Sequence, residues 1–459
     1  MTTAADSCAT KPQFKRVLTR WDLIVYGLAM LTPTAAFPVY GIIQNRSLGH
    51  AVLSYLVVMV PMLFTAASYG KMAGAYPVAG STYTYAQRAL NTHVGFLAGW
   101  AMILDYFLIP LLSVIYCADV GVRLLPVVPY GVWVLLITAG ITFVNIRGIQ
   151  VTARASGLMT YIMCICAVLF ALCAAVKTVM MGGAPALIHL QSFYNPATFS
   201  LNPLMLGAAI AALSYIGFDA ISTMAEDTIH PEKDISYATV LVCLVQTVFC
   251  VGVVYLASLV WSDYRTLPAA ETAILDISKH AGGPLLFGII TFALVVAGLA
   301  CALTGQAGAS RLLFGMGRDG VISRRVFAHL DARYATPTRS IYLMAGVSLV
   351  GSFMTFELAT QLLNFGAFVG FILVNLSVIR HYYIRLHRRK GWDFIQYFLF
   401  PFLGALFCGY IWISLTPVAK LVGFAWLGLG VIYLAILTKG FREAPKPLST
   451  LTEGTVDAN

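Results

Sequence analysis

Charged residues are scarce in this chain of 459 residues. Asp, Glu, Lys and Arg together make up 10% of it, whereas hydrophobic residues make up 59%. A soluble domain carries about 25% charged and 45–50% apolar residues. So few charges cannot cover a water-exposed surface, which excludes a soluble globular protein. We therefore expect an all-α, multi-pass membrane protein that is surrounded by the lipid bilayer.

Motifs for metal binding, disulfide frameworks and catalysis are also missing. The nine cysteines form no CxxC pair and no cluster with histidine, and almost all fall inside apolar runs. This pattern predicts buried thiols and excludes a metal centre or a disulfide scaffold. The motifs HExxH, GxSxG and GxxxxGK(S/T) do not occur, so a membrane-embedded enzyme is the less favoured class and no cofactor is expected.

Long apolar runs dominate the sequence. A transmembrane helix needs about 20 mostly apolar residues, and twelve runs come near this length. The runs are 23–43, 51–69, 94–117, 130–146, 157–176, 203–225, 238–261, 284–316, 340–356, 358–379, 394–416 and 421–438. With twelve crossings, 23 of the 29 Lys and Arg lie on one side of the membrane. That side is predicted to be the cytoplasm, and it holds both termini. The net charge of +10 is thus explained by orientation, and nucleic acid is not expected as a partner.

Two of the apolar runs are interrupted. The first reads GLAMLTPT over residues 27–34 and is followed by Pro38, and proline removes a helix hydrogen bond. The sixth reads SYIGFD over residues 214–219, which places a glycine beside a charge at mid-membrane depth. The breaks lie about 190 residues apart, which predicts two five-helix units related by inversion. The alternative is that these residues are ordinary, because Gly and Pro are common in membrane helices.

This interpretation divides the chain into five parts. A cytoplasmic tail is expected over 1–20 and the first five-helix repeat over 21–176. The second, inverted repeat is expected over 203–379. Two additional helices then occupy 394–438, and a cytoplasmic tail covers 439–459.

Several stretches near these breaks have a familiar order and spacing. They include GLAMLTP (27–33), YPVAGSTYTYAQ (76–87), HVGFLAGWAMILDY (93–106), GFDAISTMAED (217–227), SRLLFGMGRDG (310–320) and LLNFGAFVGFILVNLSV (362–378). In them the chain resembles the amino acid–polyamine–organocation (APC) superfamily, and within it bacterial putrescine importers. The resemblance implies a LeuT-like fold of five plus five helices with two more, in a bacterial plasma membrane. The importers carry an acid shortly after the first-helix TP, where this chain has Pro38.

The backbone at the two breaks is predicted to contact the substrate. Half-helix ends carry partial charges, so their N-termini attract carboxylates and their terminal carbonyls attract cations or amines. The predicted substrate contacts are Ala29, Thr32, Pro33, Thr34, Tyr106, Ser214, Tyr215, Gly217, Phe218 and Asp219; for Tyr106 this role is implied by the resemblance. Asp219 has two possible roles, as the cap of the inner half-helix or as the partner of an amine.

Three further acids are candidates for coupling or gating. They are Asp105, Glu226 and Asp227, and an ionised group at a helix centre costs roughly 2.5–3.5 kcal/mol on insertion scales. Glu226 comes two helical turns after Asp219 and is expected on the same face, either as a coupling or gating acid or as an interfacial acid paired with a cytoplasmic Arg. Asp227 is expected at the membrane interface, with a gate ion pair to Arg311 or Arg318 as the alternative. Asp105 is either functional or hydrogen-bonded to a neighbouring helix.

Together these observations predict secondary active import of a small amine-bearing solute, putrescine-like, by alternating access. The resemblance implies that a proton gradient drives it, with a sodium gradient as the alternative. An amino acid permease or exchanger of the same superfamily is the second candidate. The oligomeric state is not indicated by the sequence.

Overall fold

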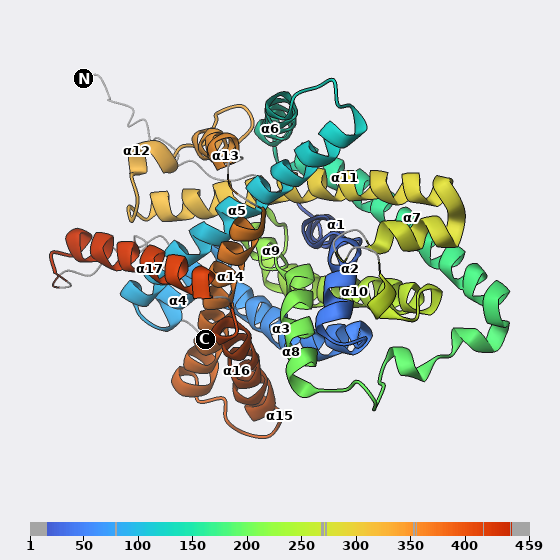
Figure 1. Ribbon diagram of the computed structural model, residues 1–459. Helices are drawn as coiled ribbons and strands as arrows, with labels where there is room; N and C mark the ends of the chain where they lie inside the picture. Colours follow the sequence, from blue (N-terminus) through green and yellow to red (C-terminus); the bar gives the residue numbers. More distant parts are fainter. Residues whose placement is uncertain are drawn as a thin grey trace, which may run out of the picture.

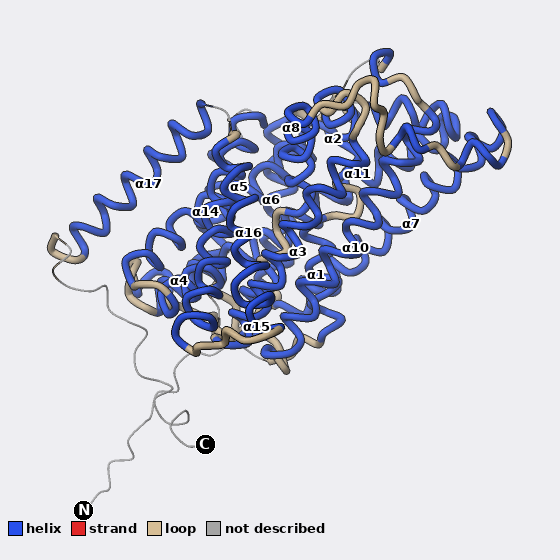
Figure 2. Tube along the Cα trace, turned by 90° about the horizontal axis from the view of Figure 1, so that it is seen from below, coloured by secondary structure: helices blue, strands red, loops and turns tan. Residues whose placement is uncertain are grey.

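The computed structural model describes residues 16–78, 80–267, 270, 273–351, 354, 356–415, 417–440 and 442. Residues 1–15 and 443–459, which make up most of the two predicted tails, lie outside the described residues. In the described part of the chain, helices account for the regular structure, and a single backbone bridge joins Leu18 to Thr228. Figure 2 shows the helices side by side, with most loops gathered at the two ends of the bundle.

The helices succeed one another along the chain with short connections. They are α1 (Arg20–Leu31), α2 (Ala36–Arg46), α3 (Ala51–Ala75), α4 (Ser81–Ala89), α5 (Thr92–Leu124), α6 (Tyr130–Ile146), α7 (Ile149–Gly182), α8 (Leu201–Ala211), α9 (Ala220–Thr223), α10 (Pro231–Val260), α11 (Ala273–Arg318), α12 (Arg324–Phe327), α13 (Thr338–Gly351), α14 (Phe356–Val378), α15 (Trp392–Phe394), α16 (Phe400–Ile413) and α17 (Pro417–Leu437).

Each predicted apolar run contains a helix, but not all of these helices are long. Nine segments of the described chain are long and apolar enough to cross a membrane, and α1 with α2 makes a tenth if the bent pair is one span. Helix α6 has 17 residues and α13 has 14, which is short of the roughly 20 that a bilayer core requires. The protein is thus a multi-pass membrane protein, and its twelve crossings stay a prediction.

The first predicted interruption is confirmed. Thr19 caps the start of α1 through a capping box with Asp22. Helix α1 ends at Leu31 because Thr32 adopts a positive φ of 56° and Pro33 comes directly after it. The chain resumes as α2 after a bend of 51°. Pro38 lies in the first turn of α2, where no intrahelical donor is lost.

The second interruption is also confirmed, and it is longer than the sequence suggests. Helix α8 tightens into the 3₁₀ turn η3 (Ala212–Tyr215), and Gly217 then adopts a φ of +117°. The inner half-helix α9 has only four residues and leads into a second 3₁₀ turn, η4 (Ala225–Asp227). A regular half-helix from Asp219 to Glu226, which the predicted two-turn spacing assumed, is therefore absent.

The two broken segments pack directly against each other. A Cβ added at Gly217 would lie 2.6 Å from Cγ of Met30, and one added at Gly27 would lie 2.5 Å from Cδ1 of Ile221. A side chain at Gly217 would also be strained by its φ of +117°, and one at Gly27 would require the side chain of Ile221 to shift. Figure 1 shows α1 and α9 in the interior of the bundle, near α10 and α11. The breaks therefore meet at the centre of the molecule.

Besides the four-residue helix α12, two longer helical segments were not expected from the sequence. Helix α4 falls in the predicted loop after the second run, because its sequence STYTYAQRA lacks an apolar stretch. The other precedes the eighth run, where α11 begins at Ala273 and kinks at Gly282 and Gly283. The run predicted from residue 284 starts just after that kink.

Candidate functional site

Asp219 lies buried between the two breaks and contacts α5. Its side chain is 1% exposed, and Oδ2 accepts a hydrogen bond of 2.6 Å from the hydroxyl of Tyr106. Its other oxygen, Oδ1, has no hydrogen-bond partner among the described residues. Asp219 occupies the N-cap position of α9 but makes no side-chain capping bond. Of its two predicted roles, the capping one is therefore not seen, and a carboxylate with one unused oxygen remains.

A second acid is buried one residue before Tyr106. Asp105 is 0% exposed, and neither carboxyl oxygen has a hydrogen-bond partner among the described residues. Helix α14 approaches it closely, since a Cβ at Gly366 would lie 3.3 Å from Cβ of Asp105. The predicted alternative, a structural hydrogen bond to a neighbouring helix, is not present in this part of the chain. Asp105 and Asp219 thus lie near Tyr106 without compensating cations, which is costly unless a ligand or proton neutralises them.

The backbone carbonyls at both breaks are held by one side chain that was not predicted from the sequence. Nε2 of Gln246, on α10, lies 3.0 Å from the Thr32 carbonyl oxygen and 3.1 Å from that of Ser214. Its side chain is fully buried. A single amide in the apolar run LVCLVQTVFC (241–250) is the signal that could have drawn attention to it.

Other predicted contacts are turned toward neighbouring helices. The hydroxyl of Ser214 shares a hydrogen bond of 2.9 Å with Tyr55, and that of Tyr215 shares one of 2.8 Å with Thr247. Ala29 belongs to a small apolar cluster with Met163 on α7. These side chains brace the broken helices in this structure.

The remaining predicted residues at the two breaks are buried or partly buried. Pro33 and Thr34 are buried in the first break, and the Thr34 hydroxyl has no hydrogen-bond partner among the described residues. The ring of Phe218 contacts two other rings, Tyr69 at 5.6 Å between centroids and Phe371 at 5.1 Å. Phe218 therefore belongs to an aromatic cluster that joins α3, the second break and α14.

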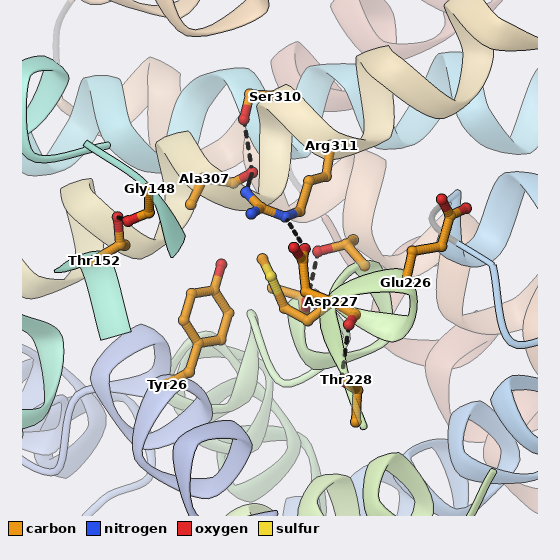
Figure 3. A network of polar contacts seen from close by, with 12 residues as sticks. Tyr26, Gly148, Thr152, Glu226, Asp227, Thr228, Ala307, Ser310 and Arg311 are labelled. Carbon is orange, nitrogen blue, oxygen red and sulfur yellow. Dashed lines mark hydrogen bonds and ion pairs between the residues drawn. The ribbon is translucent and has the colours of Figure 1, made fainter. Parts of the chain in front are cut away.

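Ion pairs close the end of the bundle that is predicted to face the cytoplasm. Nε of Arg311 lies 2.7 Å from Oδ2 of Asp227, as Figure 3 shows. Both side chains are nearly fully buried. Glu226 instead points away from Arg311 in that view and contacts Arg318 at 2.8 Å. The contact of Asp227 with Arg311 is the ion pair that the sequence analysis gave as the alternative for Asp227, and its position relative to the membrane interface stays a prediction. The 3₁₀ turn η4 turns Asp227 inward, whereas Glu226 keeps 17% of its side chain exposed.

The segment before α1 is fastened to the same end. Backbone amides of Val17 and Leu18 donate to the carbonyl oxygen of Asp227, and Arg20 forms an ion pair of 2.8 Å with Asp234 on α10. The start of α1, the end of the second break and the start of α10 are thus joined. This end is closed in the structure.

A further buried acid, not predicted from the sequence, comes directly after α11 at this end. Asp319 is 3% exposed. Burial raises its pKa to about 6, although Tyr83, Arg318 and Arg88 act in the opposite direction and Glu226 adds to the rise. A carboxyl with this pKa changes its charge close to physiological pH.

The chain shares its sequence with known permeases over nearly its whole length. The amino acid permease family profile matches residues 22–439. The low-affinity putrescine importer PlaP of Escherichia coli K12 is 33% identical over 95% of this chain and 96% of its own length. The branched-chain amino acid permease BcaP of Bacillus subtilis is 26% identical over 91% of this chain and 92% of its own, and the methylthioribose transporter of that organism is 25% identical over 92% of both.

Proposed function

Because this chain belongs to the amino acid permease family, we propose that it imports a small diamine such as putrescine across the bacterial inner membrane. The transporter would be secondary active, with twelve spans in a five-plus-five inverted repeat and two helices after it. The similarity to a putrescine importer over 95% of the chain supports this assignment. So do the two confirmed breaks, which are typical of inverted-repeat carriers.

The proposed substrate is inferred from the two buried acids, Asp105 and Asp219. Asp219 keeps one oxygen without a hydrogen-bond partner among the described residues and Asp105 keeps two, and Tyr106, which bonds to Asp219, follows Asp105 on α5. A diamine brings two positive charges, one for each carboxylate. An α-amino acid would bring its own carboxylate into a region that already holds two acids, and like charges in a low dielectric repel strongly. The site therefore suits a dication.

Proton coupling is the driving force that these residues support best. When no amine is bound, a buried carboxyl is most stable with a proton. Asp105 and Asp219 can thus hold a proton or an ammonium group in turn. Release toward the cytoplasm would require the Asp227–Arg311 and Glu226–Arg318 pairs to separate, because they close that end.

An amino acid permease is the second candidate. It is favoured by the similarity to a branched-chain amino acid permease over 91% of the chain. Pro38 also stands where the resembling importers carry an acid. On this alternative the substrate carboxylate would be held by backbone donors at the breaks.

Ligands with the same four-carbon chain can distinguish a diamine importer from an amino acid permease. Purified protein would be heated with putrescine, with n-butylamine, which lacks the second ammonium, or with 4-aminobutyrate, which replaces it by a carboxylate. We expect putrescine to raise the melting temperature most, because bound ligand stabilises the folded state. Stabilisation by leucine but not by putrescine would contradict the proposal.

A variant tests whether Asp105 binds the second charge. Asp105→Asn should remove the difference between putrescine and n-butylamine while leaving n-butylamine binding in place. Asp263→Asn serves as the control, because Asp263 is exposed on the turn before α11. If Asp105→Asn keeps the full preference for putrescine, Asp105 does not contact the substrate.

A further inference from the structure

Gln246 occupies a position that is built to attract positive charge. Its Nε2 lies within 3.4 Å of three backbone carbonyl oxygens, those of Leu31, Thr32 and Ser214. The first two belong to the end of α1, and the third belongs to η3 just before the second break. The amide therefore joins the ends of both broken segments.

The carbonyls gather there because both helices stop inside the protein. The last carbonyls of a helix have no intrahelical partner, and the C-terminal end carries a partial negative charge. Two such ends meet at Gln246, away from water. In inverted-repeat transporters, unwound carbonyls and half-helix ends of this kind coordinate a sodium ion or a proton.

We propose that the carboxamide of Gln246 takes the place of a cation at this junction. Its NH₂ group has two N–H donors, which are shared among the three carbonyls and Sγ of Cys250 at 3.4 Å, and the group carries no net charge. Its Oε1 has no hydrogen-bond partner among the described residues. The reversed amide would direct Oε1 at three carbonyl oxygens and is disfavoured by repulsion between the oxygens. The amide thus holds the breaks together and leaves no place for sodium there.

The proposal reaches beyond the transported substrate, because it concerns the inorganic cation. It assigns a positioning role to Gln246, which acts on the breaks through their carbonyls. The site then holds two kinds of hydrogen-bond acceptor, the backbone carbonyls at the breaks and the carboxylates. The carbonyls are satisfied by the protein itself, so a substrate amine is left to the carboxylates of Asp105 and Asp219.

The charge of the side chain gives a direct test. In Gln246→Glu a carboxylate faces the same three carbonyls, and a bound sodium ion would restore the neutral charge of the original amide. At pH 8 we expect NaCl to raise the melting temperature of this variant by about 2–4 °C over choline chloride at equal ionic strength. The unaltered protein should show no such difference.

Gln306 on α11 offers a matched control. It is also 0% exposed, but its amide bonds to the side chains of Asn145 and Thr142 and to no broken helix end. Gln306→Glu should therefore gain no response to sodium. A response of equal size in both variants would show a general effect of burying an acid, and it would overturn the proposal.

A second variant covers the case in which Gln246→Glu does not fold. Gln246→Ala removes the amide donor from the carbonyls of Leu31 and Ser214 and leaves the Thr32 carbonyl only its bond from the Ala35 amide, so sodium should stabilise it in the same direction as it does Gln246→Glu. Absence of a sodium response in the folded variants, or an equal response in the unaltered protein, would contradict the proposal. These measurements use no substrate, so their outcome does not depend on whether the protein transports a diamine.

Discussion

Tyr106 holds the carboxylate that the proposed site depends on. Its hydroxyl donates to Asp219 at 2.6 Å, and both side chains are buried. Asp219 and Tyr106 could be chosen from the sequence, because an acid beside a glycine at mid-membrane depth is unusual and the DY pair matches the resembling importers. The hydrogen bond between them could not be predicted, because it joins residues 113 positions apart.

Removing that hydrogen bond should weaken transport without abolishing it. A hydrogen bond to a charged group contributes about 1.5–3 kcal/mol, so Tyr106→Phe should raise the KM for putrescine by about tenfold or more. The measurement is initial uptake against substrate concentration. Tyr433→Phe on α17 is the control, because its hydroxyl donates to the Val321 carbonyl, beyond the end of α11 and outside the proposed site. An unchanged KM in Tyr106→Phe would remove Tyr106 from the site.

Neutralising Asp219 should have a larger effect. Asp219→Asn keeps the shape of the side chain but removes the charge that an ammonium group needs. We expect the KM for putrescine to rise more than in Tyr106→Phe, while the folded protein is retained. Unchanged uptake would contradict a substrate-binding role for Asp219.

At the scale of single elements, glycine and proline revealed where the helices break but not how the chain continues beyond each break. The stop at Thr32 and the positive φ at Gly217 are local properties, so they could be predicted. The four-residue length of α9 and the 3₁₀ turn after it depend on packing against other helices. For that reason the spacing of two helical turns could not place Glu226 relative to Asp219.

The buried ion pair should matter more than the exposed one. Leaving one charge of a buried pair unpaired costs about 3–5 kcal/mol, so Asp227→Asn should destabilise the contacts at the end that is predicted to face the cytoplasm. We expect faster labelling of cysteines introduced at that end. Glu226→Gln is the comparison, because the Glu226–Arg318 pair is less buried and its loss should speed labelling less. Equal labelling in both variants would contradict a special role for Asp227–Arg311.

The raised pKa of Asp319 leads to a prediction of how the free energy of unfolding depends on pH. Its pKa is raised to about 6, so the folded protein binds a proton more tightly than the unfolded chain does. Its charged form therefore lowers stability above pH 6, by about 3 kcal/mol at most, and this loss is relieved as the pH falls from about 6 toward 4. Asp319→Asn should raise the melting temperature at pH 7.5, and the gain should shrink at pH 5. A gain that is the same at both values would contradict this account.

At the scale of the whole molecule, composition and loop charges predicted most of the architecture. They led to a multi-pass, all-helical protein and to helices in all twelve apolar runs. They did not reveal helix α4 or the part of α11 before Gly282, because neither segment is strongly apolar at the window length that detects spans. The run predicted over 130–146 matches the bounds of α6, so the shortness of that helix was already visible in the sequence.

The predicted orientation can be tested by labelling from one side. Val127, in the turn before α6, is 92% exposed and is predicted to face outward. His387, in the basic segment after α14, is exposed and predicted to face the cytoplasm. In intact cells an impermeant maleimide should label Val127→Cys but not His387→Cys, beyond the labelling of the unaltered protein. The reverse pattern would overturn the topology.

Transport itself tests the central claim most directly. Protein in liposomes with an alkaline interior would be given labelled putrescine, with and without an excess of branched-chain amino acids. We predict that the pH gradient drives accumulation, that dissipating the gradient stops it, and that the amino acids do not compete. Accumulation of the amino acids in place of putrescine would contradict the account and would assign this permease a different substrate.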